Sequence, residues 1–220
     1  MSDLSARRPL KSRSTSWAAS LSRALLQWGA TPNQVSVASS VFAIASACSM
    51  LFGVQLMGSV VAWLLAAVFI QMRLVCNLMD GMLAVEGGLK TPNGDLFNEF
   101  PDRVSDVAIL AALGHAQGNS TAIALGWFAA CGALMTACVR MHGASLIGKH
   151  DFRGPMAKPQ RMALATVACL AVAALSFAKM GWPIITWALG VIVVGIAITI
   201  VRRLAALSAE LHQRQTSQVP

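Results

Sequence analysis

Six of the nine acidic residues of this chain lie within thirty positions, between Asn77 and Asp106. Two of these acids stand beside amides at helical spacing. Asn77 and Asp80 are three residues apart and Asn98 and Asp102 are four apart, so each pair shares one face of a helix. Carboxylate and amide oxygens, with no His or Cys at ligand spacing, suit Mg²⁺, Mn²⁺ or Ca²⁺. Because Mg²⁺ is normally shared with substrate phosphates, the pattern predicts a site for a phosphate or pyrophosphate.

Small residues lie on the same two helical faces, namely Gly81, Ala84 and Gly94, and they leave room for a bulky group to approach the backbone. Between the two helices, residues 86–93 (EGGLKTPN) are rich in turn-forming residues and predict a short connection. A helical hairpin would then bring the four oxygen-bearing side chains together near the membrane surface. The alternative is a buried polar network that only locks the two helices to each other.

The elements that position this hairpin are predicted to be membrane helices. The chain is 56% hydrophobic and 12% charged, with a mean hydropathy of +0.62, which is outside the range of ordinary soluble domains. Unbroken apolar runs favour helices over a barrel. We therefore predict an all-α polytopic membrane protein with six transmembrane helices, at residues 34–54, 58–85, 96–113, 122–147, 162–180 and 183–204.

An amphipathic helix is predicted ahead of these six spans, because Trp17, Leu21, Leu25 and Trp28 form one stripe. This pattern is typical of a helix lying in the membrane interface, and we interpret it as an anchor without a catalytic part. The predicted organisation is a basic segment, an interfacial helix, a six-helix domain and a flexible tail, at residues 1–14, 15–28, 33–211 and 212–220.

The basic residues predict the orientation of the chain. With both termini in the cytoplasm, 13 of the 17 Lys and Arg residues fall in cytoplasmic segments and only Lys179 falls outside. The net charge of +8 then reflects topology and anionic lipid. It does not predict nucleic-acid binding, because the basic residues are not clustered with stacking aromatic residues. Short length and sparse loops favour a bacterial inner membrane, with the site on the cytoplasmic side.

Residues 77–102 resemble the signature of the CDP-alcohol phosphatidyltransferases, D-x-x-D-G-x-x-A-R, eight residues, then G-x-x-x-D-x-x-x-D. This chain reads N-L-M-D-G-M-L-A-V, eight residues, then G-D-L-F-N-E-F-P-D, with the same spacing throughout. TPNQVS, DRVSD, CVRMHGASLIG and RGPMAKPQRM also resemble segments of the family. The chain departs from the signature at three positions: Asn77 and Asn98 replace aspartates, and Val85 replaces the arginine.

The resemblance implies a homodimeric membrane transferase that moves a phosphatidyl group from CDP-diacylglycerol, or a similar CDP-lipid, to a small alcohol and releases CMP. It implies catalytic roles for Asp80 and Asp102. It implies that one or two Mg²⁺ or Mn²⁺ ions are held by Asn77, Asp80, Asn98 and Asp102. It also implies nucleotide binding at Gly81, Ala84 and Gly94.

Basic residues at the end of the fourth span and in the loop that follows form a second polar cluster. The resemblance implies that such residues bind the acceptor alcohol and its phosphate, here Arg140, Arg153, Lys158 and Arg161. The alternative is that the loop cations only set topology. Three further charged residues are predicted to support the site: Arg73, Glu99 and Asp106. Arg73 either replaces the guanidinium missing at Val85 or neutralises Asp80 or Asp106.

Two other functions remain open on the sequence alone. One is a degenerate relative that binds CDP-lipid or metal without turnover, because three signature residues are replaced. The other is a transporter that uses Arg73, Asp80 and Asp102 as a relay within the membrane. A transporter predicts charges spread across the depth of the membrane, whereas here the charges cluster at one end.

Overall fold

The computed structural model describes residues 15–216, so the predicted basic segment and the last four residues of the predicted tail lie outside the described residues. Within residues 15–216 the chain is helical and contains no strand. The elements are α1 (Ser16–Gln27), α2 (Pro32–Cys48), the π-helical turn η3 (Ser49–Gly53), α3 (Val54–Met57), α4 (Ser59–Val85), α5 (Gly94–Gln117), α6 (Ser120–Ile147), α7 (Lys158–Phe177) and α8 (Ile184–Thr216).

Five of these helices are long and apolar enough to cross a membrane, when α2, η3 and α3 are taken together as one span, Pro32–Met57. The other four are α4, α6, α7 and α8. The third predicted span corresponds to α5, which carries four carboxylates between Asp95 and Asp106, and α5 is not among the five. The chain is therefore an all-α integral membrane protein with five candidate spans, and a sixth span at α5 remains a prediction.

Two helix ends differ from the prediction for local physical reasons. Helix α7 begins at Lys158 rather than near residue 162, because Pro159 suits the first turn of a helix even though its neighbours are polar. Helix α8 continues to Thr216, through residues 212–216 of the predicted flexible tail. A hydropathy pattern finds the apolar part of a helix but not its polar ends.

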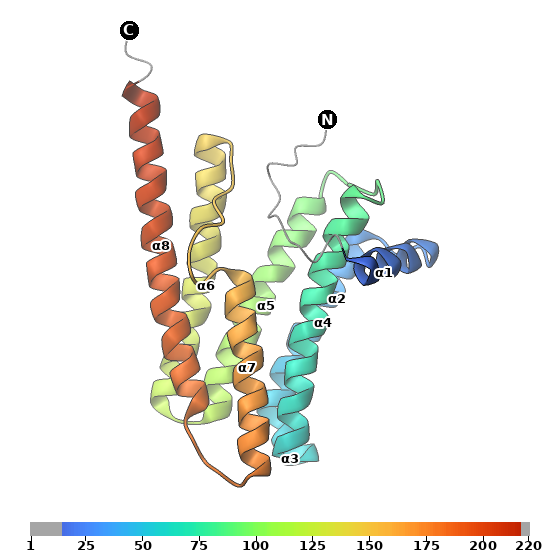
Figure 1. Cartoon of the computed structure of the whole chain (residues 1–220), viewed down its shortest axis with the longest axis vertical. Helices are drawn as coiled ribbons and strands as arrows, with labels where there is room; N and C mark the ends of the chain where they lie inside the picture. Colours follow the sequence, from blue (N-terminus) through green and yellow to red (C-terminus); the bar gives the residue numbers. More distant parts are fainter. Residues whose placement is uncertain (1–14, 217–220) are drawn as a thin grey trace.

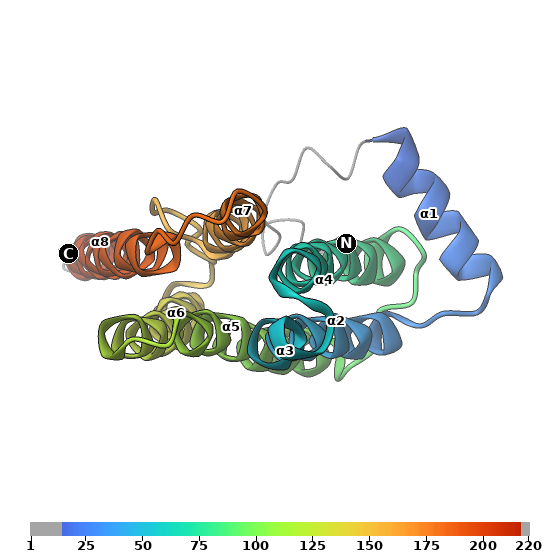
Figure 2. The ribbon, with the colours of Figure 1, turned by 90° about the horizontal axis from the view of Figure 1, so that it is seen from below.

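The helices form two rows, with α2, α5 and α6 in one row and α4, α7 and α8 in the other (Figure 2). The main contacts within the rows are α2 with α5, α5 with α6 and α4 with α7, and those between the rows are α2 with α4 and α6 with α8. Helices α4 and α5, although consecutive, barely contact each other. The predicted hairpin is therefore open, and α2 joins its two arms.

Small residues allow the helices to approach closely. The core contains many buried alanines, and Ser46 Oγ and Ser49 Oγ donate hydrogen bonds across to the carbonyls of Ala66 (3.0 Å) and Ala62 (2.8 Å) on α4. Such contacts hold helices together where apolar lipid offers no hydrophobic driving force.

Helix α1 lies across the direction of the bundle (Figure 2) and packs on the upper part of α4. Ala18 is buried in a cluster with Leu78, Met79 and Leu83, and Leu21 and Leu25 pack against the same cluster. The two tryptophans of the predicted stripe are more exposed, Trp17 at 47% and Trp28 at 81%. The leucines of the stripe therefore pack against the protein, while its two tryptophans face outward. An interfacial position for α1 remains a prediction.

The connections sort to the two ends of the bundle. The α4–α5 turn, the α6–α7 loop and the end of α8 lie at one end, and the α3–α4 and α7–α8 connections lie at the other (Figure 1). Lys179 belongs to the α7–α8 connection, which is the arrangement that the distribution of basic residues predicts. Which end faces the cytoplasm remains a prediction.

A close crossing of α5 and α6 generates a prediction about stability. A Cβ atom at Gly126 on α6 would lie 2.8 Å from the Leu110 carbonyl oxygen and 3.0 Å from the Gly114 Cα atom on α5. Gly126→Ala should therefore destabilise the protein by about 1–3 kcal/mol, because the two backbones must separate. Thermal unfolding of the purified protein in detergent measures the change.

The matched control is Gly190→Ala on α8, where a Cβ atom would meet nothing within 4 Å. This variant should be neutral or slightly stabilised, because Ala favours helix over Gly. Equal unfolding temperatures for the two variants would contradict the close crossing of α5 and α6.

Candidate functional site

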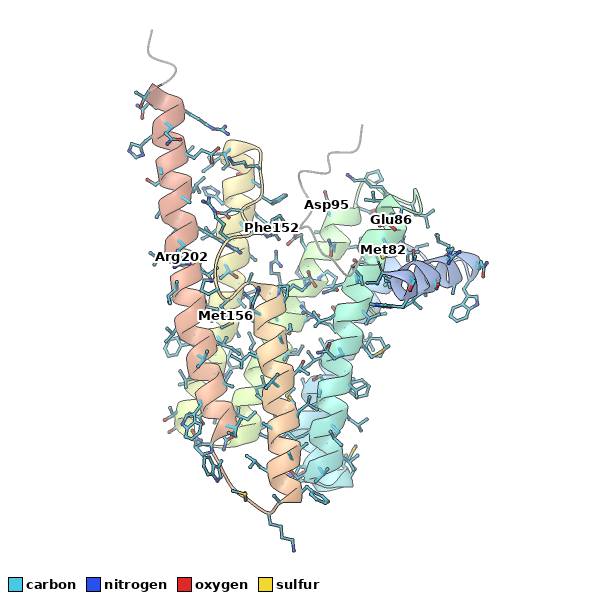
Figure 3. The ribbon with its side chains drawn as sticks, in the orientation of Figure 1. Met82, Glu86, Asp95, Phe152, Met156 and Arg202 are labelled. Carbon is cyan, nitrogen blue, oxygen red and sulfur yellow. The ribbon has the colours of Figure 1, made fainter. Side chains whose placement is uncertain are left out.

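A cavity of about 520 Å³ lies between α4, α5, α6 and the beginning of α7. Four of its lining residues are the oxygen-bearing side chains singled out in the sequence, Asn77, Asp80, Asn98 and Asp102. The turn that joins α4 and α5 has Glu86 and Asp95 at its two sides, where the two helices end and begin (Figure 3). The structure therefore brings together, in one cavity, the residues expected to form a site.

Helix α2 positions the two α4 side chains of this cavity. Ser36 Oγ donates to Asp80 Oδ2 at 2.7 Å, and Ser39 Oγ donates to Asn77 Oδ1 at 2.7 Å. Both serines are buried. Sequence reasoning missed them, although serines spaced i, i+3 in an apolar span are a detectable signal that one helical face is polar.

Asp102 joins three helices. Asn77 Nδ2 on α4 donates to Asp102 Oδ1 at 2.9 Å, and the Lys158 ammonium at the start of α7 pairs with Asp102 Oδ2. Arg73 Nη2 lies 3.6 Å from Asp102 Oδ1. Both oxygens of this carboxylate are therefore already engaged by donors of the protein itself.

A buried ion cluster lies one helical turn further along α5. Asp106 accepts from Arg73 at 2.7 Å through Oδ1 and from Arg161 at 2.7 Å through Oδ2. Arg161 also donates to Thr136 Oγ1 and to the Met156 carbonyl. All three charged side chains are at most 4% exposed. The sequence left two roles open for Arg73, replacing the missing guanidinium or neutralising an aspartate. Its 2.7 Å contact with Asp106 matches the second role.

The lining of the cavity carries a second ion group. Glu99 accepts from Arg140 at 2.6 and 2.8 Å and also pairs with Arg103. The Arg140 guanidinium lies over the Phe152 ring, 5.8 Å from its centroid, with His150 Nδ1 at 3.4 Å. His150 stands in the α6–α7 loop, where burial and the nearby Arg140 lower its imidazole pKa below the ordinary value. A neutral His150 therefore accompanies Arg140 at neutral pH.

The remaining predicted residues are distributed unevenly. Gly81 lines the cavity, whereas Ala84 and Gly94 lie outside its lining, closer to the α4–α5 turn. Among the four cations predicted to bind the acceptor, Arg140, Lys158 and Arg161 line the cavity and Arg153 does not.

Arg153 instead lines a separate cavity of about 310 Å³, between the end of α6, the α6–α7 loop and α8. Its side chain is 66% exposed and pairs with Asp151 at 3.0 Å. Burial alone would raise the pKa of Asp151, but the hydrogen bonds and charge of Arg153 outweigh it and hold that pKa below the ordinary value. This pair is therefore ionised at neutral pH. It lies in the α6–α7 loop, outside the lining of the larger cavity.

The donor set of the larger cavity fits one divalent ion better than two. Within residues 15–216 no three His, Cys, Asp or Glu side chains are placed to hold an ion together. Asp80 has one oxygen bonded to Ser36, and Asn98 is exposed at the cavity, so these two side chains could share an ion with a phosphate. Asp102 is engaged at both oxygens, which leaves no carboxylate to centre a second ion.

A bundle of apolar helices around a charge-lined cavity defines an integral membrane protein with a polar internal site. Solved structures with the same fold include those of phosphatidylinositol phosphate synthase (PgsA1) from Mycobacterium tuberculosis. The structure with manganese and citrate matches with a TM-score of 0.66 at 18% identity, covering 86% of this chain and 88% of that one. The structure with CDP-DAG bound gives 0.65 at 19%, covering 86% and 92%. The apo form gives 0.63 at 22%, covering 84% and 93%.

The chain is also similar in sequence to the inner membrane protein YnbA of Escherichia coli strain K12. The two are 29% identical over 171 residues, which cover 76% of this chain and 83% of that protein. No family model matches the chain. The likeness to the synthase shows that this chain has the same fold, and it leaves the activity to be argued from the site.

The buried ion cluster generates the second prediction. Asp106→Asn removes the charge that neutralises Arg73 and Arg161, and breaking a buried ion pair in this way costs about 3–5 kcal/mol. The apparent unfolding temperature in detergent should fall markedly.

The control variant is Glu210→Gln, which removes an acid that pairs with Lys149 and Arg214 at the exposed end of α8. It should unfold close to the unchanged protein, because such exposed pairs contribute little to stability. A stable Asp106→Asn protein would mean that Arg73 and Arg161 do not depend on this carboxylate.

Proposed function

We propose that this protein is a membrane transferase that moves a phosphatidyl group from CDP-diacylglycerol, or a similar CDP-lipid, to a small alcohol and releases CMP. The observation that carries the proposal is the convergence of Asn77, Asp80, Asn98 and Asp102 in one cavity. The fold supports it, because a synthase with the same fold has been solved with CDP-DAG bound and with manganese.

The charges of the cavity suit a diphosphate. Its lining carries five cations, Arg103, Arg140, Lys158, Arg161 and Arg203, and four acids, Asp80, Glu99, Asp102 and Asp106. The lining therefore has one positive charge in excess, and Arg73 adds another directly behind it. The excess positive charge of the cavity therefore balances an anionic group that enters it.

The surroundings suit a lipid substrate. Leu74, Val75 and Leu78 give the α4 side of the cavity an apolar wall, and α4, α6 and α7 around it are apolar enough to span a membrane. The acyl chains of a CDP-lipid would remain in the bilayer while its diphosphate enters the charged cavity. Of the three residues expected at the nucleotide, Gly81 is the one at the cavity wall.

In the proposed reaction the hydroxyl of the acceptor attacks the phosphorus that carries the diacylglycerol. The bond from that phosphorus to the bridging oxygen breaks, the oxygen leaves with CMP, and the hydroxyl proton passes to Asp102. Asn77 holds the Asp102 carboxylate in place through its hydrogen bond. A Mg²⁺ or Mn²⁺ ion held by Asp80 and the Asn98 amide, beside Asn77, would offset charge on the diphosphate.

The acceptor would bind beside Arg140, Lys158 and Arg161, with Arg153 near the neighbouring cavity. Guanidinium and ammonium groups bind a phosphate well, so an alcohol phosphate suits this wall. The rest of the proposal is a homodimer in a bacterial inner membrane, with both termini and the site on the cytoplasmic side. The inner-membrane relative YnbA supports this location.

A second candidate is a relative that binds CDP-lipid without turnover. The observation behind it is that Asp102, the proposed base, is already paired with Lys158 and hydrogen-bonded to Asn77. One measurement distinguishes the two functions: the transferase releases CMP, and the binding protein does not.

The third prediction tests the proposed function directly. Purified protein with Mg²⁺ or Mn²⁺, CDP-diacylglycerol and a panel of alcohols and alcohol phosphates should release CMP. Asp102→Asn should lower the rate by about 10²-fold or more, because the acceptor proton loses its base. The control is Asp95→Asn on the same helix, outside the cavity lining, and it should keep the full rate.

Binding of CDP-diacylglycerol without CMP release, with every acceptor and either metal, would instead establish the second candidate. Full activity of Asp102→Asn would remove this carboxylate from the reaction while leaving the transferase itself in place.

A further inference from the structure

Lys158 occupies an unusual place for a lysine. It is the first residue of α7, its side chain is only 26% exposed, and its ammonium pairs with Asp102 inside the larger cavity. It also acts electrostatically on Asp80 and on Asp106. One cation therefore serves the three aspartates that line the cavity.

The backbone around Lys158 holds the side chain in this place. Pro159 fixes the first turn of α7. Three residues after Lys158, on the same helical face, Arg161 is anchored by Asp106, Thr136 and the Met156 carbonyl. The start of α7 is thus tied to α5 and α6, which fixes the backbone from which the Lys158 side chain enters the cavity.

The oxygen donors opposite Lys158 are poor in charge. Asn77 and Asn98 are neutral amides, so Asp80 and Asp102 are the two acids among the four convergent side chains. Asp102 has an ammonium at one oxygen and the Asn77 amide at the other, with the Arg73 guanidinium 3.6 Å away. A divalent ion brought to Asp102 would meet two positive charges and little negative charge to offset them.

We propose that the Lys158 ammonium is the permanent counterion of Asp102 and occupies the place where a second divalent ion would otherwise bind. The site then binds a single exchangeable divalent ion, at Asp80. The proposal rests on the proposed function, because it gives a CDP-linked diphosphate as the ligand that the two cations share.

The charges of such a site stay close to neutral. Asp80 and Asp102 supply two negative charges, and Lys158 with one divalent ion supplies three positive charges, an excess of one positive charge. The diphosphate of a CDP-lipid brings two negative charges, one on each phosphate, and leaves an excess of one negative charge, with Arg140 and Arg161 nearby at the wall. With two divalent ions the same residues would carry three positive charges in excess before the diphosphate binds, in a cavity surrounded by apolar helices. Lys158 would donate to a non-bridging oxygen of the diphosphate, which is ordinary phosphate chemistry for an ammonium.

The number of ions bound tests the proposal. Full-length protein in detergent is titrated with Mn²⁺ in the presence of saturating CDP, and bound Mn²⁺ is counted by electron paramagnetic resonance. The unchanged protein should bind one Mn²⁺ per chain, without the spin coupling of two neighbouring ions. Lys158→Gln removes the ammonium and frees Asp102, so a second Mn²⁺ should bind and couple to the first.

Two further variants make the result specific. Lys158→Arg keeps the positive charge and should still bind one Mn²⁺ per chain, which separates a role of charge from damage to the start of α7. Lys90→Gln removes an exposed cation of the α4–α5 turn, outside the cavity, and should also bind one.

Two coupled Mn²⁺ ions in the unchanged protein would overturn the proposal, as would a count in Lys158→Gln that stays at one or no Mn²⁺ binding at all. The proposed function fails separately. Absence of CMP release with an unchanged pattern of Mn²⁺ counts would refute the transferase and leave the Lys158 assignment standing. CMP release together with two bound ions in the unchanged protein would support the transferase and refute the Lys158 assignment.

Discussion

A carboxylate enclosed by apolar helices is stable only when cations and hydrogen-bond donors replace the water it has lost. Asp106 meets this requirement with two arginines, Arg73 from α4 and Arg161 from α7, each 2.7 Å from one of its oxygens. These contacts join three helices at one depth of the bundle. Removing any one of these charges would leave a buried charge without its partner. The cluster therefore fixes how α4, α5 and α7 are placed. The position of the cavity above it follows from that placement.

The cavity exists because α4 and α5 do not pack against each other. Helix α2 contacts both, and its serines turn a polar face toward them: Ser36 and Ser39 hold Asp80 and Asn77, while Ser40 donates to the Pro101 carbonyl at 3.0 Å. A tight hairpin would have filled this space with side chains. The separation of the two arms leaves room for a ligand, and the serines keep the polar groups satisfied while they face it.

Sequence patterns predicted what depends on local spacing and composition. Long apolar runs predicted the helices, and i, i+4 spacing predicted that Asn98 and Asp102 share a face. Contacts between distant segments were beyond such reasoning. Nothing in the sequence pairs Arg73 with Asp106 rather than Asp80, or brings Lys158 to Asp102. Spacing also assigned Ala84 and Gly94 to the same helical faces as the site residues, yet it does not say how far along a helix a cavity extends, and both lie beyond its lining.

The amide at position 77 has a physical role that a carboxylate could not perform. Asn77 accepts from Ser39 through Oδ1 and donates to Asp102 through Nδ2, so both ends of its amide are used. An ionised aspartate has no donor. An aspartate at position 77 would place a second negative charge beside Asp102, where the 2.9 Å hydrogen bond now forms. A cation would then be needed between the two carboxylates. Asn77 removes that need, and Lys158 supplies the charge that Asp102 still requires. The departure from an all-acidic set is therefore matched, within the same cavity, by residues that make it stable.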